Sequence, residues 1–237
     1  MQIDVSDPQE FERLLDALSH ETVTASNHFK LYSDLQRARA TYGREFNESW
    51  TFWSLTLQSH WDTTLFRLCK IYDKDDRNGK TLNLTNLLDT IEANLSIFDV
   101  EHFRKRLTEN PFVESLASGI TRPDMAELAS DKRSVSDTDP LVKALVFWRN
   151  NFFAHRNAKP ILTKKNLADR YPLNVSDVRT LLDRAVRILG RYSIRFRASS
   201  YSTQIVGHDD YLVVLRAMQS VLVRQDDELA RDLDRYR

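Results

Sequence analysis

The chain has 237 residues, 41% of them hydrophobic and 29% charged, so it is long enough and apolar enough to bury a substantial core. Its single cysteine excludes an internal disulfide, and no apolar run approaches the ~18 residues of a membrane span. Five glycines and six prolines leave few helix breakers. The N-terminus is acidic and soon amphipathic, unlike a secretion signal. We therefore expect an all-α cytoplasmic protein.

The first predicted helix begins at Asp7 and Pro8, a capping residue followed by a proline at the first helical position. A second helix is expected over residues 28–39, before Gly43. The clearest helical pattern runs over residues 46–72. There, apolar residues step by three or four at Phe46, Trp50, Trp53, Leu57, Trp61, Thr64 and Leu68. This spacing predicts a central core helix, whose tryptophans pack in the core rather than stack on bases.

The rest of the chain is predicted to be helices joined by polar segments. The charged residues 73–80 are expected to form a solvated turn, and two short helices should cover 83–95 and 99–108. Residues 119–140 are polar and contain few large hydrophobic side chains, which predicts a long loop or a mobile segment. Three helices are expected over 139–156, 176–199 and 209–236. Because helices on both sides of the loop can share one core, the prediction is a single domain over 1–237.

Charge is unevenly distributed although the net charge is zero. Residues 141–200 hold thirteen Lys and Arg against three Asp and Glu, a net of +10, so the remainder carries −10. A basic half of this kind is typical of a surface for a polyanion such as RNA. The candidate RNA-binding residues are Arg156, Lys159, Lys164, Lys165, Arg184, Arg187, Arg191 and Arg195. The alternative is a solvated face whose acidic partners lie elsewhere in the fold.

The segment WRNNFFAHRN places Arg149 and His155 six positions apart. The pattern, an arginine followed by a histidine after four to six intervening residues, is weak alone, since Arg13 and His20 also match it with six residues between them. Arg149, however, is followed by polar asparagines and lies in the basic half. On a straight α-helix the two side chains would point about 120° apart and lie about 9 Å apart along the axis. Either His155 is a half-buried histidine with an arginine at its rim, or a second copy across a two-fold axis completes one cleft.

No metal or cofactor is expected. The other histidines show no paired ligand spacing, and the lone Cys69 has no partner cysteine. The sequence contains no glycine-rich phosphate loop, which argues against a nucleotide-binding fold of the P-loop or dinucleotide type.

The stretch RNNFFAH resembles the motif of the HEPN superfamily, an arginine and a polar residue followed by a histidine in an all-α domain. Residues 59–88, SHWDTTLFRLCKIYDKDDRNGKTLNLTNLL, followed by the later RN…AH helix, resemble the AbiU-type branch associated with abortive infection. The resemblance implies a HEPN-like helical bundle with additional helices that forms a homodimer. It also implies catalytic roles for Arg149 and His155, with Asn150 as a polar helper.

The activity implied by this resemblance is metal-independent RNA cleavage in phage defence or as a toxin. The products would carry a 2′,3′-cyclic phosphate and a 5′-hydroxyl. An antitoxin or another defence-system protein is a further expected partner. The chain departs from HEPN toxins paired with a nucleotidyltransferase, because no tyrosine follows His155 until Tyr171. The alternative function is a non-catalytic HEPN-like module that binds RNA, nucleotides or proteins.

Overall fold

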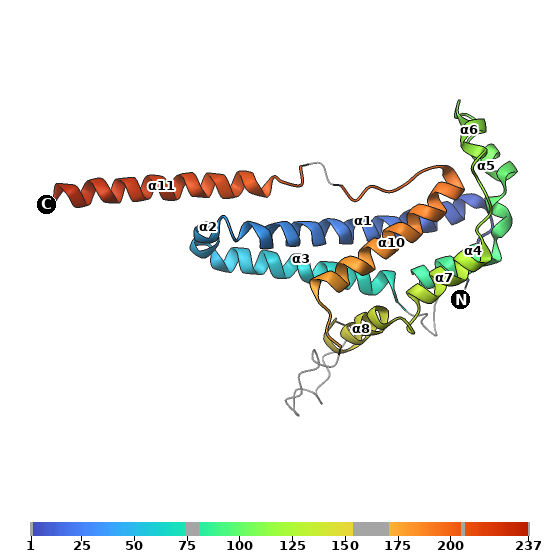
Figure 1. Cartoon of the computed structure of the whole chain (residues 1–237), viewed down its shortest axis with the longest axis horizontal. Coiled ribbons are helices and arrows are strands. Elements are labelled where there is room, and N and C mark those ends of the chain that lie inside the picture. The colour runs from blue at the N-terminus through green and yellow to red at the C-terminus, as the bar shows by residue number, and fades with distance from the viewer. Residues whose placement is uncertain (1, 74–80, 154–170, 205–206, 237) are drawn as a thin grey trace. The chain divides into compact units, whose positions relative to one another are not determined.

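The computed structural model of the chain describes residues 2–73, 81–153, 171–204 and 207–236, and within them the regular elements are helices (Figure 1). The long helices are α1 (Pro8–Ala38), α3 (Trp50–Ile71), α10 (Val175–Arg197) and α11 (Tyr211–Arg235). The shorter elements are α2 (Gly43–Glu48), α4 (Leu84–Ala93), η1 (Leu95–Phe98), α5 (Val100–Arg106), α6 (Val113–Ala117), α7 (Met125–Val135), α8 (Pro140–Trp148) and η2 (Arg149–Phe153). The predicted all-α class is confirmed. None of the described helices is long and apolar enough to cross a membrane.

The chain groups into two compact units. Unit 1 comprises residues 1–26 and 65–202, and unit 2 comprises residues 27–64 and 203–237. Helices α1 and α3 each contribute to both units. Whether the units fold as the single domain expected from the sequence stays a prediction.

The core of unit 1 is built around aromatic side chains from the start of α1, from η1 and from the end of α10. The ring of Phe11 packs at 5.5 Å from Phe98 and at 5.0 Å from Phe196, and Tyr192 lies 6.4 Å from Phe98. All four side chains are fully buried. The apolar stripe predicted for α10 is buried throughout, at Val178, Leu182, Ala185, Leu189, Tyr192 and Phe196. Helix α10 is therefore a central element of this unit.

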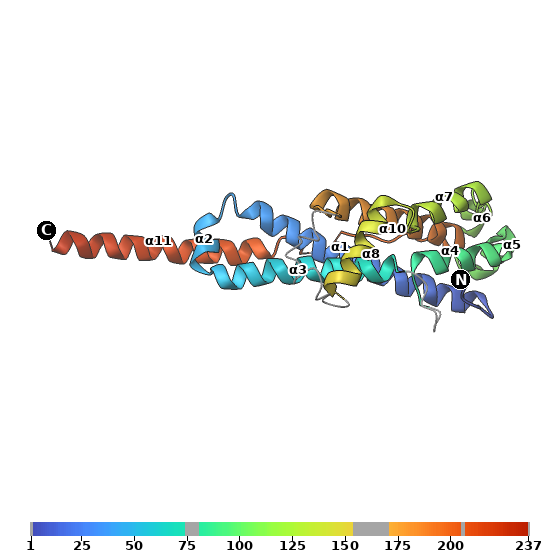
Figure 2. The ribbon, with the colours of Figure 1, turned by 90° about the horizontal axis from the view of Figure 1, so that it is seen from below.

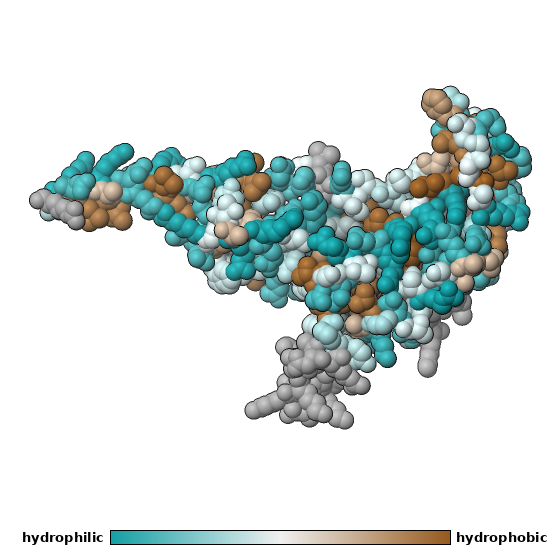
Figure 3. Space-filling view, viewed as in Figure 1, coloured by the Kyte–Doolittle hydropathy of each residue, from teal (hydrophilic) through white to brown (hydrophobic). Residues whose placement is uncertain are grey.

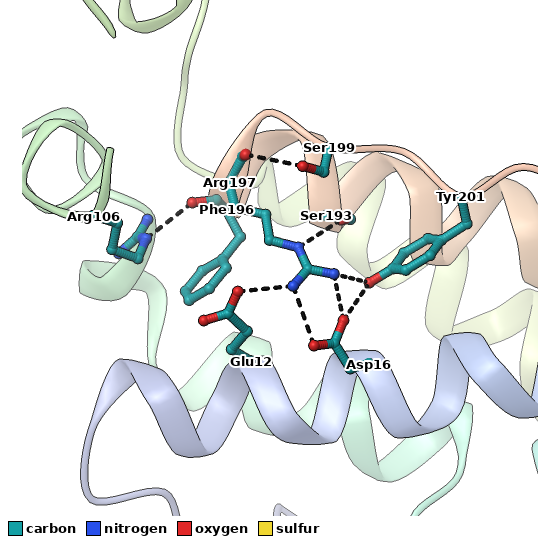
Figure 4. A network of polar contacts seen from close by, with 8 residues as sticks. All are labelled: Glu12, Asp16, Arg106, Ser193, Phe196, Arg197, Ser199 and Tyr201. Atoms are coloured by element: carbon teal, nitrogen blue, oxygen red, sulfur yellow. Dashed lines mark hydrogen bonds and ion pairs between the residues drawn. The ribbon is translucent and has the colours of Figure 1, made fainter. Parts of the chain in front are cut away.

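A polar network fastens the end of α10 to α1 (Figure 4). Arg197 forms ion pairs with Glu12 at 2.7 Å and with Asp16, and it donates to the Tyr201 hydroxyl at 2.6 Å. Arg106 stacks on the Phe196 ring at 4.0 Å and donates to the Phe196 carbonyl at 2.9 Å. Burial lowers the pKa of Arg106 to about 10, which leaves the guanidinium charged at neutral pH. These contacts fix the register of α10 on α1.

Unit 2 contains a second hydrophobic core, between the parts of α1 and α3 that run side by side and are joined by α2 (Figure 2). Its buried members are Leu35, Ala38, Phe46, Trp53, Leu57 and Leu215. Arg44 of α2 forms a two-pronged ion pair with Asp226 of α11. Beyond this point α11 exposes Leu229 and Leu233 among charged residues. Figure 3 shows separate apolar patches among hydrophilic ones along this helix.

Two helix boundaries and the burial of one tryptophan differ from the sequence-based expectation. Helix α1 continues unbroken through residue 28, because the hydroxyls of Thr22 and Ser26 donate to the carbonyls four residues earlier and fit the helix. Trp50 is 51% exposed at the first position of α3, where its ring contacts Arg39. The α-helix expected over residues 139–156 ends at Trp148 and continues as a π-helical turn through Phe153.

The polar segment 119–140 contains helix α7, where a loop or mobile segment was expected. Asp124 caps the helix by accepting from the Ala126 N–H at 3.1 Å. Its buried face comprises Leu128, Asp131 and Val135. One of these three positions is an aspartate, so the apolar periodicity is too sparse to reveal the helix from sequence alone.

Candidate functional site

Arg149 stands at the junction between α8 and the π-helical turn. Asp139 caps α8 by accepting from the N–H groups of Leu141 and Val142, and Pro140 fits the first helical position. At the other end, the side-chain amide of Asn151 donates to the Phe147 carbonyl at 2.8 Å. That carbonyl is the one an α-helix would offer to the Asn151 backbone. The two asparagines of the motif, Asn150 and Asn151, therefore lie where the α-helix changes to a π-helical turn.

The side chain of Arg149 is held by two oxygen acceptors. Its guanidinium forms an ion pair with the carboxylate of Asp73, at the end of α3. Its Nε donates to Oδ1 of Asn150 at 3.0 Å. The Arg149 side chain is 27% exposed and that of Asp73 is 29% exposed. The arginine is thus oriented by the protein while it remains open to solvent.

Tyr171 is the first described residue after the gap at 154–170, and it packs against α8. Its ring lies 4.5 Å from the ring of Phe147, and its carbonyl accepts from the Trp148 indole at 2.8 Å. The chain thus leaves and re-enters the described structure beside Arg149. His155, Arg156, Lys159, Lys164 and Lys165, all sequence-predicted site residues, lie outside the described residues.

Cys69 lies one helical turn before Asp73 and does not have the character of a nucleophile. Its thiol is buried and its closest polar contact is the Leu145 carbonyl, at 4.0 Å. Burial raises the pKa of the Cys69 thiol to about 12, against the opposing influence of the nearby Arg149. The thiol is neutral at physiological pH and behaves as part of the core.

A cavity of about 320 Å³ adjoins the Arg149–Asp73 ion pair in unit 1. Asp73 is part of its lining, together with Thr85 from α4, Val135 and Ser136 from the end of α7, and Asp137. The same aspartate therefore contacts the motif arginine and faces the cavity.

The arginine stripe predicted on α10 exists, but three of its members form ion pairs within the fold. Arg184 pairs with Asp139 at 3.2 Å. Arg191 pairs with Asp131 at 2.5 Å and Glu127 at 3.0 Å, and Arg195 also pairs with Glu127. These ion pairs favour the alternative named from sequence, in which acidic partners lie elsewhere in the fold. Arg187 is exposed, and among the described residues it forms no ion pair.

Unit 2 holds a separate polar feature that the sequence did not reveal. The Nδ1 atoms of His28 on α1 and His60 on α3 lie 2.8 Å apart, which makes one imidazole the donor and the other the acceptor. Burial, with a smaller contribution from His28, lowers the pKa of His60. A cavity of about 370 Å³ lies beside the pair, and His208 also lines it. Within the described ranges, no group of three or more His, Cys, Asp or Glu side chains is placed to hold a metal.

An all-α bundle with an arginine–asparagine pair at a helix end has the architecture and motif expected of a HEPN protein. The model of the HEPN family described as AbiU2 matches residues 8–215, so the chain belongs to this family. No curated protein and no solved structure matches the chain. The family match ends at Leu215, inside α11.

Sequence reasoning missed Asp73 and Tyr171 as members of this site. Asp73 follows the apolar pattern of α3 and begins a run of charged residues, a pattern that predicts a solvated turn. An ion pair between residues this far apart in the chain leaves no local pattern. The only available signal was the position of Asp73 at the end of the helix within the family-like stretch.

Proposed function

We propose that this protein is a metal-independent endoribonuclease that acts in phage defence or as a toxin. The observation that carries the proposal is the orientation of Arg149 by Asp73 and Asn150 within a chain that belongs to the HEPN family. A guanidinium fixed at a solvent-open position is suited to bind a phosphate in two-pronged fashion.

The proposed reaction is internal transesterification of RNA. A ribose 2′-hydroxyl attacks the adjacent phosphorus and the bond to the 5′-oxygen of the next nucleotide breaks, leaving a 2′,3′-cyclic phosphate and a 5′-hydroxyl. His155 transfers the proton, and Arg149 stabilises the negative charge that grows on the phosphoryl oxygens. Asn150 holds the guanidinium in position through its amide oxygen. The role of His155 rests on the family motif.

The active form is proposed to be a homodimer in the cytoplasm. In such a dimer each protomer contributes its Arg149 and its His155, so that two arginines and two histidines line one cleft across the two-fold axis. RNA is the substrate, and an antitoxin or another defence-system protein is the partner that restrains the enzyme. Arg187 and the basic residues that follow His155 would attract the RNA backbone.

Incubation of the purified protein with total RNA in EDTA tests this proposal, with His155→Ala beside the wild type. The expected result is cleavage by the wild type alone, with cyclic-phosphate ends. If neither protein cleaves RNA but both bind it equally, the chain is the non-catalytic binding module. If neither cleaves nor binds RNA at low salt, a protein-interaction role replaces both.

A further inference from the structure

Large exposed hydrophobic side chains are concentrated in unit 2. Within the described ranges, ten of the fifteen such residues belong to this unit, although it contains less than a third of the chain. Two of them, Trp50 and Phe52, lie at the start of α3. Three more lie near the end of α11, namely Leu229, Leu233 and Tyr236. A concentration of exposed apolar side chains is typical of a surface that contacts another protein.

The exposed side chains near the end of α11 continue a stripe that is buried earlier in the same helix. Leucine or tyrosine recurs every seven residues, about two helical turns, at Leu215, Leu222, Leu229 and Tyr236. Leu215 and Leu222 are buried, and Leu215 belongs to the core of unit 2. Leu229, in contrast, is 62% exposed and Tyr236 is 91% exposed. The stripe is therefore covered by its own chain over its first half and open to solvent over its second.

The ion pair between Arg44 of α2 and Asp226 marks the point where this cover ends. Residues 227–236, called the tip of α11 below, follow directly, and Figure 2 shows the helix continuing past α2. The tip contains four acidic and two basic residues, a net charge of −2. A surface that complements the tip is therefore apolar and carries positive charge.

A surface with this character lies at the start of α3. Trp50 and Phe52 are both more than half exposed, and the guanidinium of Arg39 lies 5.5 Å from the centre of the Trp50 ring. Residues 37–50 contain three arginines and two glutamates, a net charge of +1. In its own chain this segment already pairs with an acidic residue of α11, through Arg44.

We propose that the tip of α11 packs on the Trp50–Phe52 surface of a second copy of this chain, and that the second copy's tip packs on the first copy in the same way. A reciprocal contact of this kind has two-fold symmetry and closes at two copies. The inference concerns self-association through unit 2, and it does not depend on RNA cleavage.

The exposed apolar area is sufficient for such a dimer. A fully covered aromatic side chain buries about 150–250 Å². Burial of the exposed parts of Trp50, Phe52, Leu229, Leu233 and Tyr236 in both copies would therefore remove on the order of 1,000 Å² of surface. This area lies near the lower limit of a specific interface between proteins.

Sedimentation velocity of the intact chain over a range of concentrations tests the interface. Leu233→Gln should weaken self-association by at least about tenfold, because each dimer loses two buried leucines. Val213→Gln is the matched control, since Val213 is an exposed residue of the same helix that points about 160° away from Leu233. It should leave the association unchanged.

Equal association of the wild type and Leu233→Gln would overturn this interface and leave the homodimer of the proposed function intact. A wild type that stays monomeric at high micromolar concentration would overturn both, whereas RNA cleavage is measured separately.

Disulfide trapping between two differently tagged chains identifies the surfaces that meet. Leu233→Cys in one chain and Phe52→Cys in the other should form a mixed disulfide under mild oxidation. Phe112→Cys, at an exposed aromatic position of unit 1, should not form one with Leu233→Cys. The native Cys69 is buried and does not compete. Equal trapping of Phe52→Cys and Phe112→Cys would overturn the proposal, and so would trapping confined to two Leu233→Cys chains.

Discussion

Arg149 forms an ion pair with Asp73, and that same carboxylate lines the neighbouring cavity. The pair joins the end of α3 to the end of α8, two segments that are far apart in the chain. Arg149 also donates to Asn150, so its guanidinium has defined acceptors before any RNA is bound. Such prior orientation is what a charge-stabilising catalytic group requires.

Replacement of Asp73 by asparagine should lower kcat without raising the KM for RNA. We expect kcat to fall by about tenfold, because Arg149 loses the carboxylate that orients it. The KM for RNA should stay the same or fall, because the site becomes more positive. Steady-state kinetics on a defined RNA measure both quantities.

The control for this substitution is Asp183→Asn, which removes a carboxylate from the exposed face of α10. It should leave kcat unchanged. An Asp73→Asn enzyme with unaltered kcat would show that the ion pair has no positioning role.

The arginines of α10 should differ in how much each contributes to the free energy of unfolding. Arg191→Met removes the cation that pairs with the buried Asp131, and the free energy of unfolding should fall by about 1–3 kcal/mol. Arg187→Met should change it by less than about 0.5 kcal/mol, as is usual for an exposed position. Urea unfolding measures both. Equal losses in the two variants would contradict the structural role of the Asp131 pair.

Sequence patterns predicted the helices well wherever the buried face is continuously apolar. Helix α10 is the clearest case, because its buried positions recur with helical spacing and Asn174 and Asp177 form a capping box at its start. Helix α7 was missed because its buried face carries Asp131, whose partner Arg191 lies on another helix. Polar pairs of this kind are formed by the tertiary structure. The local sequence of neither helix reveals that the two residues will pair.

The candidate site was predictable only in part for a related reason. Arg149 and Asn150 stand next to each other in the sequence, so their contact follows from the motif. The acidic partners of the α10 arginines and of Arg149 come from distant segments. From the sequence the basic half appeared unpaired, although carboxylates from α7 and the residue before α8 neutralise much of α10.

Cys69 should be unreactive in the folded protein. Its buried thiol has a pKa raised to about 12, and thiol reagents attack the thiolate. We expect modification by a chromogenic disulfide reagent to occur only as fast as the chain opens, and to become rapid in denaturant. Rapid native-state reaction at pH 7.5 would contradict the burial of this side chain beside α8.

The stability of unit 2 should decrease as the pH falls below about 6.5, the ordinary pKa of histidine. The folded-state pKa of His60 is lowered by burial and by His28, so the unfolded chain takes up the proton first. His60 therefore contributes stability above that pH, and the contribution declines as the pH falls towards the lowered pKa. Other charged or titratable residues that line the same cavity include His28, Lys30, His208 and Asp210.

The corresponding measurement is urea unfolding at pH 7.5 and pH 5.5. The loss of stability between the two should be smaller in His60→Gln than in the wild type. It should be unchanged in His102→Gln, whose imidazole lies in unit 1 and contacts the Ser96 carbonyl. The same pH dependence in all three proteins would refute the role of the His28–His60 pair.

Single-turnover cleavage of one defined RNA in EDTA tests the central claim most directly. Arg149→Ala and His155→Ala should each slow cleavage by about 10²- to 10⁴-fold, and a 2′-deoxy nucleotide at the scissile position should abolish it. Arg13→Ala and His20→Ala are matched controls, because this exposed pair on α1 also fits the motif, with six intervening residues instead of five, and should keep the full rate. Equal rates in Arg149→Ala, His155→Ala and the wild type would contradict the assignment of these residues as the catalytic pair.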